Sequence, residues 1–239
     1  MVWLEAKAIF DPDELGLPIV GIAAVLAEHD SGEHQHNMGQ LLFIRNGCIR
    51  ITLSGRLCML PPVRVAWIPA KTKHRVEMKG VTGYRSVYID TARIPSLANE
   101  IEVLEANPLL CEILERIALS RLDTDWQRGA ASHLLALGLD EIHNAPREPV
   151  ILRLPTDRRL INFNENELPP TLKEFSSTVG ASEKTISRIF IRETGLNYQQ
   201  WRQQWRFLKA VELLSQHKSV FSVASALGFS SDSEFVFFF

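Results

Sequence analysis

The chain has 239 residues, of which 46% are hydrophobic and 23% charged, and its formal net charge is −2. This length can hold one large domain or two small ones, and the composition is ordinary for a soluble globular protein. No apolar run approaches the roughly 18 residues that a membrane-spanning helix needs. The segment Met1–Glu14 places acids where a signal peptide has its apolar core. We therefore expect a cytoplasmic protein without a membrane partner.

Residues 1–95 are expected to form a β-sandwich or small barrel. Asn46-Gly47 separates two apolar runs and predicts a two-residue hairpin, because both turn positions of such a turn need a positive φ. After this dipeptide, apolar residues alternate with polar ones up to Leu53, which indicates one buried and one solvated face. Further short runs of this kind follow at similar spacing without a helix between them, as is typical of an all-β domain.

Residues 96–152 have the pattern of a helical linker. Asn107 followed by Pro108 marks a helix start, and an apolar stripe at helical spacing follows. A second amphipathic helix is predicted from Trp126 to His143. The two helices would either pack on the barrel or form a contact with a second copy of the chain. Residues 144–155 contain three prolines and are expected to connect two domains.

Residues 153–239 are expected to be entirely helical. We predict helices near residues 157–164, 171–179, 183–193, 197–215, 219–227 and 231–239. This part of the chain has 11 Lys and Arg against 9 Asp and Glu, whereas the remainder has 15 against 19. Six of the basic residues lie between Lys184 and Lys209. Such a run is usually a solvated helix face, but it also suits a domain that faces a polyanion.

Two segments share the layout of a helix-turn-helix: a short helix, a glycine turn and a second helix capped by serine. In the first segment Gly180 supplies the turn and Ser182 the cap. In the second, Gly228-Phe229 form the turn and Ser231 begins a capping box with Glu234. The helix predicted over 197–215 would join the two units and place them in successive major grooves of DNA.

The segment ASEKTISRIFIRETGLNYQQWRQQWRFLKAVELL, followed by VASALGFSSDSEF, closely resembles the DNA-binding domain of AraC/XylS-type transcription regulators. The resemblance covers Leu154–Phe239 and implies an activator or repressor that binds double-stranded promoter DNA. It places base-reading positions of the first unit at Lys184, Ser187 and Arg188, with Thr185 and Arg192 nearby. In the second unit the implied reading positions are Asp232, Ser233, Val236 and Phe237.

The chain stops at Phe239, inside the second predicted recognition helix, without a glycine or basic last turn. The resemblance implies a further turn and a final covering helix. We therefore expect the second unit to be truncated and unstable, with weak DNA binding.

Two histidines one residue apart lie before the predicted hairpin. His34, His36 and Gln40 share parity, so on one regular strand their side chains point to one face. The pattern His34-x-His36-x3-Gln40-x6-Gly47, with Pro69-x4-His74 later, resembles the two cupin motifs, in which three His and one Glu bind a divalent metal. This sequence departs from those motifs at Gln40, which replaces the Glu, and at Lys71, which replaces a Gly. Three neutral His can still hold Zn²⁺, Ni²⁺ or Cu²⁺; the alternative is a set of hydrogen-bonded histidines without metal.

Together these features predict an α+β protein: an N-terminal cupin-like barrel, two linking helices, and a C-terminal domain with two helix-turn-helix units. We expect a transcription regulator, not an enzyme, whose barrel senses a small molecule, and Arg45, Trp67 and Tyr84 are candidate pocket residues. RNA polymerase and a second copy of the chain are further candidate partners. The alternatives are a metal-dependent cupin enzyme with a vestigial helical tail and a DNA-binding scaffold that senses nothing.

Overall fold

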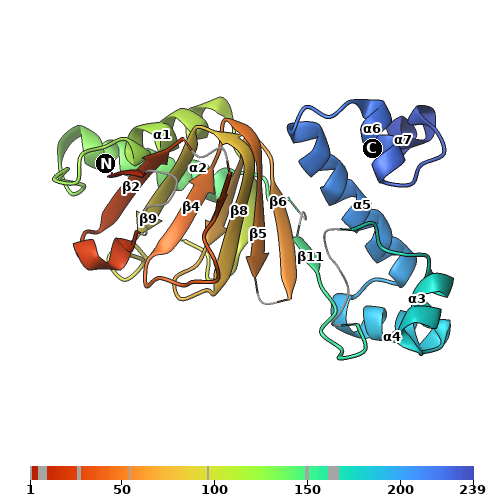
Figure 1. The fold of residues 1–239 in the computed structure, drawn as a ribbon. Coiled ribbons are helices and arrows are strands. Elements are labelled where there is room, and N and C mark those ends of the chain that lie inside the picture. The colour runs from red at the N-terminus through yellow and green to blue at the C-terminus, as the bar shows by residue number, and fades with distance from the viewer. Residues whose placement is uncertain are drawn as a thin grey trace. The chain divides into compact units, whose positions relative to one another are not determined.

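The computed structural model describes residues 2–4, 10–25, 28–53, 55–95, 97–148, 151–160 and 167–239 (Figure 1). The chain divides into two compact units, residues 1–53 with 60–150 and residues 54–59 with 151–239. Strands dominate the first unit and helices the second, so the predicted α+β class is confirmed. Within the described residues, no helix is both long and apolar enough to cross a membrane.

The first unit contains the strands of the cupin-like domain. Its larger sheet has the order β1-β2-β9-β4-β7-β10, with bounds Val2–Leu4, Ile19–Ala24, Tyr84–Ile89, Gly39–Phe43, Arg64–Ile68 and Glu102–Glu105. In the second sheet of this unit, β8 (His74–Thr82) lies between β5 (Asn46–Leu53) and β3 (Glu28–Asp30). The pair β1–β2 is parallel and the other described pairs are antiparallel. A short 3₁₀ helix, η1 (Pro12–Leu15), precedes β2.

The hairpin predicted at Asn46-Gly47 is wrong. β4 pairs with β7 and β9 in the larger sheet, whereas β5 starts at Asn46 in the other sheet and pairs with β8. Gly47 does have a positive φ of 90°, but it lies in a bulge of the β5–β8 ladder between Asn46 and Cys48. A Cβ there would come within 2.7 Å of the Gly80 carbonyl oxygen. The glycine therefore permits a bulge where the chain passes from one sheet to the other.

Two helices cover the larger sheet on the side away from the second sheet. α1 (Pro108–Ala118) contacts β2 and β9, and α2 (Gly129–Asn144) packs on α1 (Figure 1). Asn107 caps α1 by accepting a hydrogen bond from the Leu110 N–H, as its position predicts. Gly21 makes the close approach of α1 to β2 possible, because a Cβ there would lie 2.3 Å from the Ala118 carbonyl oxygen. The two helices thus pack on the barrel.

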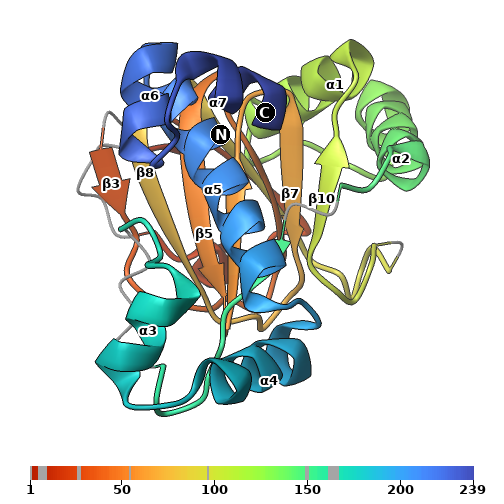
Figure 2. The ribbon, with the colours of Figure 1, turned by 90° about the vertical axis from the view of Figure 1, so that its right-hand side faces the viewer.

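The second unit is built around one long helix. β6 (Arg56–Leu60) pairs antiparallel with β11 (Ile151–Arg153), and the helices follow. Figure 2 shows α3 and α4 at one end of α5, with α6 and α7 at the other. The bounds are α3 Leu172–Val179, α4 Glu183–Thr194, α5 Tyr198–Ser215, α6 Val220–Ala226 and α7 Asp232–Phe238.

Five of the six helices predicted in the C-terminal part are confirmed. The helix predicted near 157–164 is wrong in its described part, because residues 158–160 form a turn. Residues 161–166 of that prediction lie outside the described residues.

Candidate DNA-reading and sensor sites

The first helix-turn-helix has a well-defined turn between α3 and α4. α3 ends at Gly180, which adopts φ 65°, and Ser182 caps α4 by accepting a hydrogen bond from the Thr185 N–H. An aromatic cluster beneath the turn holds the two helices on α5, with ring centroids 4.9 to 6.4 Å apart: Phe175, Phe190, Tyr198 and Trp201. The tyrosine hydroxyl donates to the Pro170 carbonyl oxygen, which fixes the start of this unit.

The outer face of α4 presents the first set of predicted DNA contacts. Lys184 and Arg188 are exposed, and neither forms an ion pair with a residue that the structure describes. Ser187 is half-buried on the same helix. Thr185 is also half-buried, and its hydroxyl is hydrogen-bonded to that of Ser182, so it belongs to the cap. Two flexible cations on an otherwise polar helix face suit contact with phosphates and guanine edges.

Most of the basic run between Lys184 and Lys209 serves the fold of the unit. Arg192 is bound to Glu193 and Asp157 at 2.6 and 3.3 Å. Arg202 donates to the Pro169 carbonyl oxygen, and Lys209 pairs with Glu212 at 2.7 Å. These three cations are thus engaged in contacts within the unit, whereas Lys184 and Arg188 of the same run are exposed. Sequence spacing alone cannot separate these cations from the two exposed ones on α4.

The largest departure is Arg206, which is buried in the second helix-turn-helix. Its guanidinium donates hydrogen bonds to the Leu227 and Gly228 carbonyl oxygens at the end of α6, at 2.6 to 2.9 Å. It also lies over the Phe229 ring, 4.1 Å from the centroid. The arginine thus adds side-chain donors to a helix end that already has a backbone cap, in which the Phe229 N–H donates to the Ala224 carbonyl oxygen and the Gly228 N–H to that of Ser225.

The predicted reading positions of the second unit lie on α7. Ser231 caps this helix, and Asp232 and Ser233 are exposed in its first turn. Val236 and Phe237 are also exposed, at 64% and 96%, while Phe235 is buried. Apolar side chains can contact a thymine methyl group but cannot donate or accept a hydrogen bond at a base edge.

The three predicted histidines of the barrel lie together. His34 and His74 form a backbone bridge with both hydrogen bonds at 2.9 Å, and their ring centroids are 4.3 Å apart. The His36 ring lies 5.1 Å from that of His74. One ring nitrogen from each of the three histidines lies within 4.8 Å of the others. His36 and His74 are buried, and His34 is half-buried.

Hydrogen bonds fix the tautomer of all three rings. The Nδ1–H groups of His34, His36 and His74 donate to the carbonyl oxygens of Gly32, Met38 and Thr72. A neutral imidazole has one N–H, so each Nε2 retains a lone pair. The buried Nε2 of His74 has no hydrogen-bond partner among the described residues. This is the arrangement of metal-binding histidines, whose outer nitrogen donates to a carbonyl while the inner one is free to bind.

Burial favours the uncharged form of His36 and His74. It lowers the pKa of His74 to about 4, and hydrogen bonding to Thr72 only partly offsets this effect. The pKa of His36 is lowered by burial too, against the opposing effects of the Met38 and Gln40 hydrogen bonds and the Asp13 charge. Both imidazoles are therefore neutral near pH 7, as a metal ligand must be.

Gln40 connects this cluster to polar groups inside the barrel. Its Oε1 lies 3.3 Å from His36 Nε2, and its Nε2 donates to Ser86 and Tyr88 at 2.9 and 3.0 Å and to Tyr84 at 3.4 Å. Because His36 already donates through Nδ1, its Nε2 is an acceptor. It faces a second acceptor, the Gln40 Oε1, at 3.3 Å. A cation between these atoms, or a reversed amide that donates to His36, would remove the conflict.

Of the three candidate pocket residues, only Tyr84 faces this interior, and burial raises its pKa to about 12. Trp67 packs in the core beneath α1 and α2 and donates to the Ala98 carbonyl oxygen. Arg45 is exposed and pairs with Glu112 and Glu115. Ser86 and Tyr88 line the interior but were not predicted; their parity with Tyr84 in one strand was the available signal.

Two family models match the chain. One, described as an AraC-like ligand binding domain, matches residues 16–144, more than half of the chain, and the other, a helix-turn-helix domain, matches residues 175–239. The chain belongs to the AraC family of transcription regulators. An AraC-type regulator binds DNA through its helix-turn-helix domain and responds to a ligand in its N-terminal domain. Family membership therefore places this chain among ligand-sensing transcription regulators.

Two HTH-type transcriptional regulators and one solved structure are among the proteins similar to this chain. The HTH-type transcriptional regulator NimR of Escherichia coli K12 is 26% identical over 217 residues, which cover 89% of this chain and 79% of NimR. RipA of Corynebacterium glutamicum is 35% identical over 63 residues, covering 26% of this chain and 19% of RipA. Among solved structures, fatty-acid-bound ToxT from Vibrio cholerae aligns with 87% of this chain and 84% of its own, at 9% identity and a TM-score of 0.36.

Proposed function

We propose that α4 is the helix that enters the major groove and that Lys184, Ser187 and Arg188 contact the DNA there. The observation that supports this assignment is the exposure of both cations without an ion-pair partner in the described part of the chain. Thr185 contributes through the cap, and Arg192 is a weaker candidate because Glu193 and Asp157 already bind it. A free guanidinium can form the bidentate contact with guanine, and a paired one first has to break its ion pairs.

For the second unit we propose that the start of α7, with Asp232 and Ser233, faces the adjacent groove. Asp232 is an anion at a helix N-terminus and suits acceptance of a hydrogen bond from cytosine N4 better than contact with a phosphate. Val236 and Phe237 would add apolar contacts only. The first unit would then supply most of the polar readout.

We further propose that His34, His36 and His74 hold a divalent cation as part of the sensor domain. The supporting observation is the buried His74 Nε2, which has no hydrogen-bond partner among the described residues while its ring is held through Nδ1. Three neutral imidazoles fit Zn²⁺, Ni²⁺ or Cu²⁺, and the Gln40 carbonyl oxygen is close enough to His36 to be a weak fourth ligand. When bound, such an ion provides an electrophilic anchor for an oxygen or nitrogen atom of an effector.

The remaining partners are proposed on the basis of family membership alone. We propose a cytoplasmic regulator that acts at promoters with RNA polymerase and self-associates as a homodimer. The barrel would serve ligand sensing and not catalysis, because among the described residues the group of possible ligands consists of imidazoles alone, beside an amide and hydroxyl groups.

Metal analysis of the purified, tag-free chain tests the sensor site. We expect the parent to hold close to one equivalent of cation and the His36→Ala variant to lose this cation. The control is His133→Ala, at an exposed histidine on α2, which should keep the cation. A His36→Ala protein with full stoichiometry would contradict the site. Binding to promoter fragments of adjacent genes, with and without the cation, tests whether the site affects regulation.

A further inference from the structure

The proposed cation site has a shortage of negative charge. An imidazole ligand brings no negative charge, and Gln40 offers a dipole where a carboxylate would offer a charge. A divalent ion in a mostly buried site is costly unless nearby anions offset its charge. The site therefore needs a nearby carboxylate whose charge is not already neutralised by a cation of the protein.

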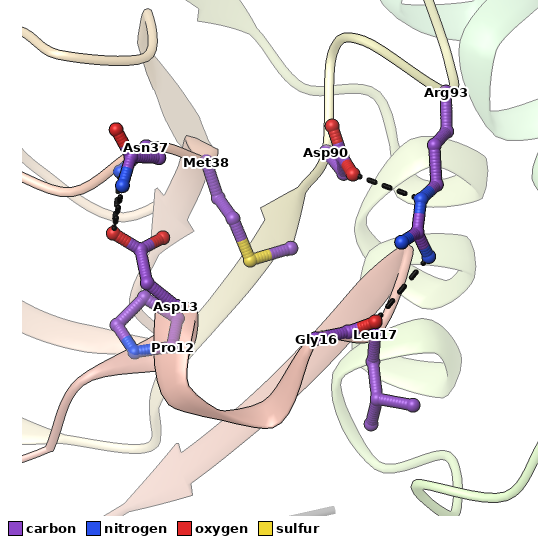
Figure 3. Close-up of a pocket in the computed structure, with 8 residues that line it drawn as sticks. All are labelled: Pro12, Asp13, Gly16, Leu17, Asn37, Met38, Asp90 and Arg93. Carbon is purple, nitrogen blue, oxygen red and sulfur yellow. Dashed lines mark hydrogen bonds and ion pairs between the residues drawn. The ribbon is translucent and has the colours of Figure 1, made fainter.

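Asp13 in η1 is such a carboxylate. Its Oδ2 accepts hydrogen bonds from the backbone N–H of Asn37 at 2.7 Å and from the Asn37 side-chain amide at 2.9 Å. Asn37 directly follows His36, so both contacts hold the loop that carries this histidine. Figure 3 shows the pair on one wall of a pocket of about 180 Å³. The N-terminal segment is thus attached to the metal-site loop through one side chain.

The second oxygen of Asp13 has no such partner. Oδ1 is buried and has no hydrogen-bond partner among the described residues. In Figure 3 this oxygen lies on the side of Met38, whose carbonyl oxygen accepts the Nδ1–H of His36. A buried carboxylate oxygen without a donor is destabilising unless a positive charge lies nearby.

The other charged residues of this pocket neutralise each other. Arg93 lies 3.1 Å from Asp90 and also donates to the Gly16 carbonyl oxygen (Figure 3). Asp13 is therefore the uncompensated charge among the residues that line the pocket. It does not belong to the group of possible ligand atoms, which contains only the three histidines among the described residues.

We propose that Asp13 is a positioning residue of the cation site: it supplies the negative charge that Gln40 lacks and holds the His36 loop through Asn37. This inference rests on the proposed cation site. It implies that cation affinity depends on the N-terminal segment, although that segment supplies no ligand.

The test compares Co²⁺ and Zn²⁺ affinities of the parent with those of Asp13→Asn and Glu14→Gln, by competition with a chromophoric chelator. Asp13→Asn keeps an oxygen that can accept from Asn37 but removes the charge. We expect its affinity to fall about 10- to 100-fold, the usual effect of losing an outer-shell partner. Glu14→Gln removes an exposed acid from the same 3₁₀ helix and should change affinity less than about threefold.

The Co²⁺ absorption spectrum provides the second readout. It should be the same in Asp13→Asn and the parent, because the ligands are unchanged. Equal affinities, or a spectrum that changes because Asp13 is itself a ligand, would overturn the proposal. A parent that takes up no Co²⁺ would instead contradict the cation site. If Asp13→Asn fails to fold, Asn37→Ala should weaken affinity several-fold by freeing the loop, and unchanged affinity there would also overturn it.

Discussion

Glu193, in the last turn of α4, accepts hydrogen bonds through one carboxylate oxygen from the backbone N–H groups of Thr156 and Asp157, at 2.8 and 3.1 Å. Its other oxygen accepts from Arg192 at 2.6 Å. The side chain is only 17% exposed, so the carboxylate takes the place of water as partner of these backbone groups. The proposed reading helix is thereby tied to the segment that follows β11.

We expect Glu193→Gln to loosen this tie. Hydrogen bonds to a charged acceptor are stronger than those to a neutral amide by roughly 1 kcal/mol. Amide exchange in residues 156–158, measured by mass spectrometry, should therefore accelerate about fivefold, while exchange in α6 stays the same. Glu183→Gln, at the exposed start of α4, is the matched control and should have no effect on this segment. Unchanged protection of 156–158 in Glu193→Gln would show that other contacts hold it.

The same contact has a predictable pH dependence. Burial acts to raise the pKa of Glu193, but hydrogen bonds from Arg192, Thr156 and Asp157 outweigh it, so the pKa lies below its usual 4.5. A carboxyl group with a lowered folded-state pKa stabilises the fold fully above its unfolded-state pKa and loses this effect as pH falls through the folded value. The ratio of exchange rates between variant and parent should therefore be constant at neutral pH and shrink below about pH 4. A ratio that shrinks toward alkaline pH would contradict this assignment.

Arg188→Ala should weaken specific DNA binding by about 1–3 kcal/mol, because a groove-facing arginine typically forms a bidentate guanine contact. Arg192→Ala should cost less, since this guanidinium is already bound to Glu193 and Asp157. Both can be measured by fluorescence anisotropy at one fixed salt concentration, with a scrambled sequence for the non-specific term. If Arg192→Ala costs more than Arg188→Ala, the reading positions on α4 are wrongly assigned.

Local signals predicted most of the helices, because these start at a polar cap next to an amphipathic stripe; α2, which follows Arg128 without a side-chain cap, is an exception. Asn107, Thr171, Ser182, Asn197 and Ser231 all cap a helix in the structure. These interactions join residues three apart, so they are visible in the sequence. The close approach of His34, His36 and His74 was also predictable, because the cupin-like pattern specifies which strand ends meet.

Contacts between distant segments were not predictable in this way. Asn46-Gly47 satisfies the local requirement of a hairpin, but the pairing of β5 with β8 decides its role. Arg206 has the spacing of a surface cation, yet it caps α6 from 21 residues away. Asp13 reaches Asn37 across 24 residues. In each case a long-range partner, which the sequence does not show, determines what the residue does.

Gln40→Glu should make the stability of the barrel depend on metal. The side chain is 2% exposed, so in the presence of a chelator the new carboxylate should lower stability by roughly 1–3 kcal/mol. Saturating Zn²⁺ should restore more stability to this variant than to the parent, because binding at about 100 times Kd contributes roughly 2.7 kcal/mol. Thermal unfolding with and without Zn²⁺ measures both effects, and Gln199→Glu on the surface of α5 is the control. Equal Zn²⁺-induced shifts in Gln40→Glu and the parent would place Gln40 outside the cation site.

Three positions offer a direct test of backbone strain in the first unit. Lys71, which stands where the cupin motif has glycine, adopts φ 62°, and Val63 adopts φ 59°. This left-handed conformation is unfavourable for a residue with a side chain, and most so for a β-branched one, so each change to glycine should stabilise the unit.

We expect a gain in stability of about 1 kcal/mol for Lys71→Gly and a larger one for Val63→Gly, because Val63 is 59% exposed and its side chain loses little packing. Gly80 has φ 62° with open space around it, so Gly80→Ala should cost about as much as Lys71→Gly gains. Urea unfolding of the three variants measures the change in the free energy of unfolding. If Val63→Gly lowers that free energy, the packing of the Val63 side chain stabilises the unit by more than its backbone strain destabilises it.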